Sequence, residues 1–555
     1  MNRLKTLLWL LIAGTSLAAA APKQTNKAVA NIITYKSDGS ILGSGYGFFI
    51  SATGEAVAPY HLFQGAYAAD IIDSGGRKYR VSRIVGAQST RDLVRFTTEG
   101  VKKADYLEIA ASPALESDPV NQLFYSTDKK SLPRAAKITQ ASDYAPYKYF
   151  ETDVPNEARF TGCPLVDAEG RVVAITQPNV AKDAATACAI DARFVNDLRI
   201  NALSALDTDL RDIRMPKQLP ETPQDALTYI YMLGSRDSLL AETAYNDYIT
   251  AYPDSVEGYT GQGTFYAETG RAEKSAASFA KALTLNHKQD EVHYALSKTI
   301  LAWLGTPAHP DHTEWTYARA AAEAAAAYTL QPYPLYLYQE ARCLFADKQY
   351  AEAAEKFDRV CTGDFASRET YFAAAKAHEL AGTDSTLVLA RMDSAISCIE
   401  KPYKTSDAPY FLEHARIATK AGEHRKAVSD YNQYEILLGP SNLTARFYFL
   451  REQAELQGRM FQQALDDIRT ARHREPEEPL YALEQAVVEL RCGLYDEAIA
   501  SAEALLALVA DNADAYKIIG IAKGEQGKPA EARKWLEKAV SLGDETAQEY
   551  LQKYQ

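Results

Sequence analysis

The sequence predicts a multidomain protein in which an all-β module precedes an all-α repeat solenoid. Between Ala28 and Ile200, short apolar or alternating runs are bounded by Gly, Ser, Asp and Asn, as expected of a β-barrel or sandwich. From Pro223 to Gln555, helix pairs recur at a spacing of roughly 34 to 37 residues, and such an internal repeat determines the fold. Prolines at positions 216, 220 and 223 mark the change between the two textures.

The first 20 residues have the pattern of a secretory signal peptide. A basic start, Met1–Lys5, leads into the apolar run Leu7–Leu17 and then into the small residues Ala18–Ala20. An uncleaved anchor is the alternative, but the run is shorter than the roughly 20 apolar residues that span a bilayer. We therefore expect an exported protein, periplasmic or secreted, whose mature chain starts near Ala21 and has no membrane span.

The charge distribution argues against nucleic acid as a partner. The net charge is −13, and the negative charge lies in the chain after Pro216, because acidic and basic residues nearly balance before that point. No basic stripe is present to neutralise phosphates, which supply most of the affinity for nucleic acids. Six cysteines permit disulfides in an exported chain but are too few for a dense disulfide framework.

The predicted domain boundaries follow the changes in composition and hydrophobic pattern along the chain. We assign residues 1–20 to the signal peptide and 21–205 to the β domain. Residues 206–222 are polar and punctuated by proline, which predicts a linker, and residues 223–555 form the helical repeat array.

The last repeat unit is the clearest and begins at Ala513. Its large and small residues follow a pattern that resembles the tetratricopeptide repeat: Tyr516, Gly520, Gly527, Ala532, Leu536 and Ala539. An earlier copy starts at Val256. We expect about eight units, including degenerate ones, with an insertion at 304–312 and a cap helix over 545–553. The resemblance implies that the concave face of the array binds a protein partner.

Three segments of the β domain resemble trypsin-like serine peptidases of the bacterial Deg type. They are residues 43–61, which end at His61, residues 89–94, which contain Asp92, and the run Arg159-Phe160-Thr161-Gly162-Cys163-Pro164-Leu165. The resemblance implies a chymotrypsin-fold domain of two β-barrels. It also implies a triad of His61, Asp92 and Thr161, in which the histidine is the base and the aspartate orients it.

Two substitutions in the last of these segments bear on catalysis. Thr161 occupies the family's serine position, and its β-branched side chain places a methyl group where substrate or imidazole has to fit. Arg159 replaces the glycine two residues earlier, whose N–H forms the oxyanion hole together with that of the nucleophile. Arginine does not adopt glycine conformations freely, and loss of one oxyanion donor costs ~10² to 10³ in rate. The substitutions therefore favour an inactive or vestigial peptidase.

The cysteines suggest one disulfide. Cys163 lies in the nucleophile loop, and Cys188 lies in a later strand that we expect to run beside it. A bridge between them would close a loop of about 25 residues and contribute roughly 3 kcal/mol, whereas the alternative is two small buried thiols. The remaining cysteines lie on repeat helices and are predicted to be small core residues: Cys343, Cys361, Cys398 and Cys492.

Two further patterns invite ligand-binding interpretations. The spaced glycines of residues 43–47 enter a β run rather than a helix, so a phosphate-binding loop is not expected. His309 and His312 have a ligand-like spacing, but Pro310 prevents a helical ligand face, which favours a polar loop over a metal site. We expect no metal and no cofactor.

Two main functional hypotheses remain. In the first, an exported scaffold couples an inactive peptidase module, used for peptide binding or as a structural unit, to repeats that bind a protein partner. Tyr333, Tyr336 and Tyr338 would line a peptide groove, although packing between helices explains them equally well. In the second, an active endopeptidase uses Thr161 as nucleophile and His61 as base, and the repeats recruit substrate. A purely structural assembly factor is a third hypothesis.

Overall fold

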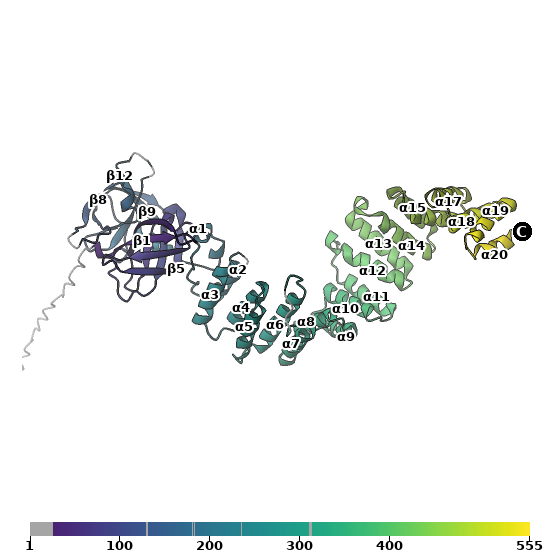
Figure 1. Ribbon diagram of the computed structural model, residues 1–555, viewed down its shortest axis with the longest axis horizontal. Helices are drawn as coiled ribbons and strands as arrows, with labels where there is room; N and C mark the ends of the chain where they lie inside the picture. Colours follow the sequence, from purple (N-terminus) through teal and green to yellow (C-terminus); the bar gives the residue numbers. More distant parts are fainter. Residues whose placement is uncertain are drawn as a thin grey trace, which may run out of the picture. The chain divides into compact units, whose positions relative to one another are not determined.

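We describe the protein from a computed structural model, which covers residues 26–128, 131–179, 181, 184–234, 236–309 and 314–554. The predicted signal peptide, residues 1–20, lies outside these described residues. The chain divides into two compact units, residues 1–287 and 288–555, and each unit is described by itself. Figure 1 shows that strands make up the start of the first unit and that helices follow. Among the described helices, none is long and apolar enough to cross a membrane.

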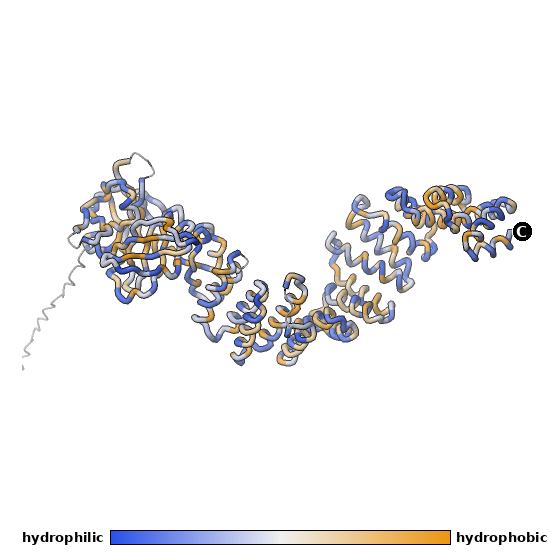
Figure 2. The backbone as a smooth tube through the Cα atoms, in the orientation of Figure 1, coloured by the Kyte–Doolittle hydropathy of each residue, from blue (hydrophilic) through white to orange (hydrophobic). Residues whose placement is uncertain are grey.

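The first β-barrel is closed by six antiparallel strands in the order β1-β2-β3-β6-β5-β4. Their bounds are β1 Val29–Tyr35, β2 Ile41–Phe49, β3 Ala56–Ala58, β4 Ala68–Ile72, β5 Lys78–Gln88 and β6 Leu93–Thr98. Alternate residues of these strands point inward, so Ile32, Ile84 and Phe96 are fully buried in its core. Hydrophobic segments accordingly follow the strands in Figure 2.

The glycines of β2 allow close approach by neighbouring chain. A Cβ on Gly45 would lie 2.7 Å from Leu62 Cδ1, and one on Gly47 would lie 2.5 Å from the Val57 carbonyl oxygen. These glycines therefore serve strand packing, as the sequence predicted, and they bring the turn that contains Leu62 onto β2.

The second β-barrel repeats the architecture of the first, with strand order β10-β11-β12-β9-β8-β7. Its strands are β7 Pro119–Gln122, β8 Arg134–Tyr144, β9 Tyr147–Pro155, β10 Pro164–Val166, β11 Val172–Gln177 and β12 Thr186–Asp191. Ile138, Phe150 and Leu165 fill its core. The two closed barrels confirm the predicted two-barrel fold.

Short 3₁₀ turns hold the residues of interest between the strands of both barrels. They are η1 Asn26–Ala28, η2 Tyr60–Leu62, η3 Ser89–Arg91, η4 Ala158–Phe160, η5 Ala192–Asp197 and η6 Ser204–Leu206. His61 lies in η2, Asp92 directly follows η3, and Thr161 directly follows η4.

Residues 206–222, which the sequence predicts to be a linker, pack against the first barrel. They contain the short helix α1, Thr208–Asp212, and then run along β5, where Ile84 N–H donates to the Pro216 carbonyl at 2.9 Å and the Gln218 N–H donates to the Ile84 carbonyl at 2.8 Å. Ile213 and Met215 are buried in the same core cluster as Ile84. A free linker would make no such contacts, so this segment fixes the first helices to the barrel.

The helices of the first unit form two antiparallel pairs. Their bounds are α2 Pro223–Gly234, α3 Ser238–Ala251, α4 Val256–Glu268 and α5 Ala272–Leu283. A Cβ on Gly263 would lie 2.7 Å from the Phe279 ring, and one on Gly258 would lie 2.7 Å from the Tyr248 ring. The small residues of the repeat pattern therefore allow the helices to approach closely, as predicted.

The second unit continues the same pattern of helix pairs. Its helices are α6 Gln289–Leu304, α7 Tyr317–Leu330, α8 Pro334–Ala346, α9 Tyr350–Cys361, α10 Arg368–Leu380, α11 Ser385–Ser397, α12 Ala408–Lys420, α13 His424–Leu438, α14 Ala445–Gln457, α15 Phe461–Arg474, α16 Pro479–Arg491, α17 Tyr495–Leu508, α18 Ala513–Glu525, α19 Pro529–Ser541 and α20 Ala547–Lys553, with short turns η7 Thr405–Asp407 and η8 Pro440–Asn442. Within the described residues, α2 to α19 make nine pairs, against about eight expected. α20 lies where a cap helix is predicted, with Leu551 packed against the Leu536 cluster.

Polar pairs recur between the two helices of a repeat. Gln262 accepts from Ser278 at 2.9 Å, and Arg451 donates to Asp467 at 2.6 Å, each pair being 16 residues apart. These side chains are buried, so each bond fixes how its two helices are aligned.

Candidate active site

The structure joins two of the three predicted triad residues. Asp92 Oδ1 accepts the backbone N–H of His61 at 2.8 Å, and Asp92 Oδ2 lies 2.7 Å from His61 Nδ1. The carboxylate therefore holds the tautomer with a proton on Nδ1 and leaves Nε2 as the basic nitrogen. The His61 side chain is 53% exposed.

Backbone geometry and the second barrel both orient Asp92. The residue has φ 48° and ψ 46°, a left-handed conformation that aspartate tolerates better than most residues. The preceding residue, Arg91, stacks over the Phe194 ring at 3.9 Å, and its carbonyl accepts the side-chain amide of Gln177. The turn that presents the carboxylate is thus fastened to the other barrel.

A residue that the sequence analysis missed, Asp209 in α1, holds the turns of both His61 and Asp92. The Asp209 carboxylate accepts the Ser89 N–H at 2.7 Å, and its backbone carbonyl accepts the Tyr60 hydroxyl at 3.1 Å. Ser89 begins the turn before Asp92, and Tyr60 immediately precedes His61. Asp209 lies in the predicted linker, and its acidic neighbours, Asp207 and Asp212, give no sequence signal that singles it out.

Gly162 brings the nucleophile loop against the His61 turn. Its φ of +82° is a glycine conformation, and a Cβ there would lie 2.6 Å from Pro59 Cδ and 2.6 Å from the Tyr46 carbonyl oxygen. Pro59 directly precedes η2, so the loop of Thr161 and the turn of His61 are in contact. Within the described residues, His61 and Thr161 nevertheless make no hydrogen bond with each other.

The loop before Thr161 is closed on itself by backbone hydrogen bonds. Turn η4 pairs the Phe160 N–H with the Glu157 carbonyl at 2.9 Å and the Thr161 N–H with the Ala158 carbonyl at 3.2 Å. The Thr161 N–H is one of the two expected oxyanion donors, and here it is already used. Arg159, the position of the second donor, lies within this 3₁₀ turn and is absent from the residues with positive φ. An oxyanion would be stabilised at Thr161 only if the turn opened.

Phe160 anchors the closed loop in the second barrel. Its ring is 3% exposed, lies 6.1 Å from the Phe124 ring, and has the Arg134 and Arg159 guanidinium groups at 4.3 and 4.7 Å from its centroid. Arg159 also pairs with Glu157 at 2.7 Å. The sequence analysis did not single out Phe160.

The predicted disulfide is wrong, because Cys163 and Cys188 are both free. β11 lies between β10, which follows Cys163, and β12, which contains Cys188. The two residues are therefore about two strand spacings, or ~9.5 Å, apart, beyond the reach of a disulfide. The two cysteines also pair with different residues of β11. The Thr176 N–H donates to the Cys163 carbonyl, whereas Cys188 pairs with Gln177. Because neighbouring residues of a strand point to opposite faces of the sheet, the two cysteine side chains do so as well. Both are buried thiols, and burial raises the pKa of Cys163.

The other cysteines match the core prediction only in part. Cys343 and Cys361 are buried, and Cys492 is partly buried. Cys398 is exposed, because it follows the last residue of α11 and lies outside the face that α11 packs. The core prediction was wrong for Cys398, because a residue that follows the end of a helix does not have to point to the packed face of that helix.

The remaining sequence candidates have structural roles where they are described. His309 stacks on Trp303 with ring centroids 4.1 Å apart, and His312 lies outside the described residues. Tyr336 donates to Asp290 at 2.9 Å and Tyr338 packs on Phe357, both of which are contacts between helices.

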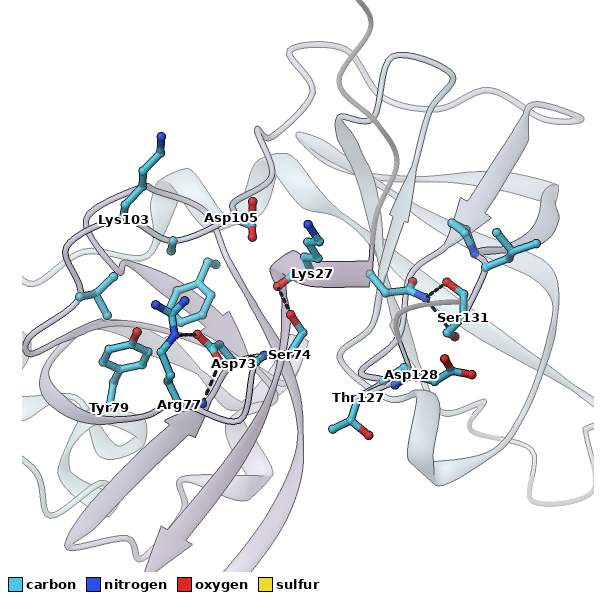
Figure 3. A pocket seen from close by; sticks show the side chains of 18 residues that line it. Lys27, Asp73, Ser74, Arg77, Tyr79, Lys103, Asp105, Thr127, Asp128 and Ser131 are labelled. Atoms are coloured by element: carbon cyan, nitrogen blue, oxygen red, sulfur yellow. Dashed lines mark hydrogen bonds and ion pairs between the residues drawn. The ribbon is translucent and has the colours of Figure 1, made fainter.

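A cavity of about 620 Å³ lies away from these residues. Figure 3 shows its walls: Asp73, Arg77 and Tyr79 from the first barrel on one side and Thr127, Asp128 and Ser131 on the other. Its charges are mixed, with Asp73 paired to Arg77 at 2.8 Å. None of the triad positions lines it. The cavity therefore adds nothing to the candidate chemistry.

Comparisons with known proteins agree with both halves of the architecture. The model of the trypsin-like peptidase domain family matches residues 43–175, and that of the tetratricopeptide repeat matches residues 233–289, 453–513 and 483–549. No curated protein matches the chain. A solved structure, the inactive form of a mutant of Rv3671c from M. tuberculosis H37Rv, is 20% identical, with a TM-score of 0.26 over 31% of this chain and 85% of that one. The chain thus contains a trypsin-like peptidase domain followed by tetratricopeptide repeats.

Proposed function

We propose that this protein is an exported protein-binding scaffold in which a catalytically impaired trypsin-like module is coupled to repeats that bind a protein partner. The observation that carries the proposal is the hydrogen bond from the Thr161 N–H to the Ala158 carbonyl. It uses an oxyanion donor, and the anchored Phe160 and the side chain of Arg159 stabilise the closed turn around it. Loss of one such donor costs ~10² to 10³ in rate, before any effect of the threonine methyl group.

A second candidate function, an active endopeptidase, is favoured by one observation. His61 and Asp92 keep the bonded geometry of a working base, and the His61 ring is open to solvent. In that case Thr161 would be the nucleophile, His61 would take its proton, and substrate binding would open the η4 turn.

The experiment that separates the two uses the full mature protein and an unfolded protein substrate. Four forms are compared: the parent, His61→Ala, Thr161→Ser, and Arg159→Gly combined with Thr161→Ser. A parent that does not cleave, together with a double variant that does, supports the impaired module. Cleavage by the parent that disappears in His61→Ala contradicts it.

The binding part of the proposal concerns the repeats. Buried polar bonds join the two helices within a repeat, and these preformed repeats are an array on which a partner can bind without further folding. Co-purification from the envelope fraction by the full chain tests this. A partner that is retained by His61→Ala and lost when the exposed residues of the concave face are changed supports the scaffold, and a partner bound only through an intact His61 contradicts it.

A further inference from the structure

A small cavity of about 60 Å³ lies where the segment after the second barrel meets the first helix pair. Ser204, Lys217 and Tyr229 line it with side chains that are 7%, 7% and 3% exposed. The exposed arginines Arg211, Arg214 and Arg236 stand around its mouth. All of its walls belong to the first compact unit.

The charges around this cavity do not balance. Asp237 is the acidic residue among its lining groups, against one lysine and three arginines. Its carboxylate is 4.0 Å from Arg214, and it also accepts the Leu240 N–H at 3.1 Å as the N-cap of α3. Within the described part of the chain, the side chains of Arg211 and Arg236 make no ion pair. An anion is therefore the ligand class that these lining residues would suit.

Buried donors face the same space. Lys217 Nζ donates to the carbonyls of Ile213 and Met215, which leaves one of its three protons unused. The Tyr229 hydroxyl, although its residue is almost completely buried, makes no hydrogen bond with the described residues. Ser204 Oγ accepts the Asn201 N–H at 2.9 Å and keeps its own proton. These three residues line the cavity, so an acceptor bound there could take hydrogen bonds from all three side chains.

The pKa of Lys217 is also shifted in this surrounding. The pKa of Lys217 is lowered to about 7, chiefly by burial; Asp237 opposes the shift and Arg214 adds to it. An anion in the cavity would favour the charged lysine.

We propose that this cavity binds a small oxyanion of the size of phosphate or sulfate. The volume is about twice the ~30 Å³ that one water occupies in the liquid, which suits an ion of about five heavy atoms. Lys217, Tyr229 and Ser204 donate to its inner oxygens, and the arginines neutralise its outer face. Arg211 belongs to α1, and Arg236 belongs to the turn between α2 and α3, so the ion joins the first helix pair to the helix that holds the His61 and Asp92 turns.

The test measures binding of inorganic phosphate to the full mature protein by calorimetry and thermal unfolding, against sodium chloride of equal ionic strength. We expect saturable stabilisation by phosphate. Lys217→Met lowers the affinity at least tenfold, and Tyr229→Phe and Arg211→Gln each lower it several-fold. Arg199→Gln, an exposed arginine outside the cavity, leaves it unchanged. Unfolding without phosphate verifies that each variant is folded, and Tyr229→Phe preserves the packing if Lys217→Met does not.

A pH series with sulfate, whose charge is constant, adds an independent measurement. The affinity is expected to fall by up to tenfold per pH unit above about 7, as free Lys217 loses its proton, and Lys217→Met abolishes this dependence. Stabilisation by phosphate no greater than by chloride, or equal in all variants, overturns the proposal. Phenyl phosphate that binds as tightly as phosphate overturns the assignment to a free ion and identifies a phosphate carried on a larger molecule.

Discussion

Asp92 holds His61 twice, through the backbone N–H at 2.8 Å and through the ring Nδ1 at 2.7 Å. The base and its orienting group therefore survive beside a nucleophile loop that is closed. On the proposed function, the module would be impaired at the oxyanion hole and the nucleophile rather than at the base.

Because the Asp92 carboxylate makes two hydrogen bonds with His61, we predict that Asp92→Asn changes the tautomer of the His61 ring. The amide can donate to Nδ1, so it favours the tautomer with the proton on Nε2, as in a triad whose aspartate has been replaced. Nitrogen-15 NMR of the His61 ring measures this. A ring that keeps its Nδ1 proton in the variant would show that Asp92 does not set the tautomer.

Asp209→Ala tests the residue that joins the two turns. Loss of the carboxylate leaves the Ser89 N–H without its acceptor, at an expected cost of about 1 kcal/mol in unfolding free energy. Hydrogen exchange at the Ser89 amide should become about fivefold faster, by the same energy. Asp254→Ala, at an exposed aspartate without such a bond, is the control. Equal hydrogen-exchange rates of the Ser89 amide in both variants would show that Asp209 does not hold this turn.

Gly162→Ala tests the contact between the nucleophile loop and the His61 turn. The substitution combines a positive φ with a clash against Pro59, and we expect a loss of about 2 to 4 kcal/mol. Gly270→Ala in the same unit has a φ of +77° and open space, so it should lose only about 1 kcal/mol. Calorimetric unfolding compares the two. A similar loss in both would mean that the loop does not press on Pro59.

The repeats contain a buried carboxyl that makes stability depend on pH. Glu452 is fully buried, its Oε1 has no partner among the described residues, and burial raises its pKa to about 8. A folded pKa above the unfolded value means that stability falls as the pH rises from about 4.5 to about 8 and is constant above that.

Glu452→Gln should therefore stabilise the second unit by on the order of 2 to 4 kcal/mol at pH 8 and have no such effect near pH 4. Helical circular dichroism during denaturation measures this at both pH values. Glu503→Gln, at an exposed glutamate, is the control. A gain that is the same at both pH values would show that Glu452 is not protonated in the folded state.

The sequence predicted the structural features that depend on patterns of neighbouring residues. Strand-sized runs and glycine spacing predicted the barrels, small residues at fixed spacing predicted the helix pairs, and family-like flanks placed His61 and Asp92 in the same site. It did not predict Asp209, because bonds to residues about 120 and 149 positions away leave no local trace. The disulfide prediction failed because it placed the strand of Cys188 beside the loop of Cys163, whereas β11 pairs with both β10 and β12 and lies between them.

The most direct measurement is cleavage of an unfolded protein substrate by the full mature protein and by its Arg159→Gly, Thr161→Ser double variant. The account predicts no detectable cleavage by the parent. The double variant should cleave the substrate at least ~10²-fold faster than the parent, and adding His61→Ala should abolish this cleavage. Cleavage by the parent that depends on His61 would contradict the central claim that the closed loop at Thr161 has lost the peptidase reaction.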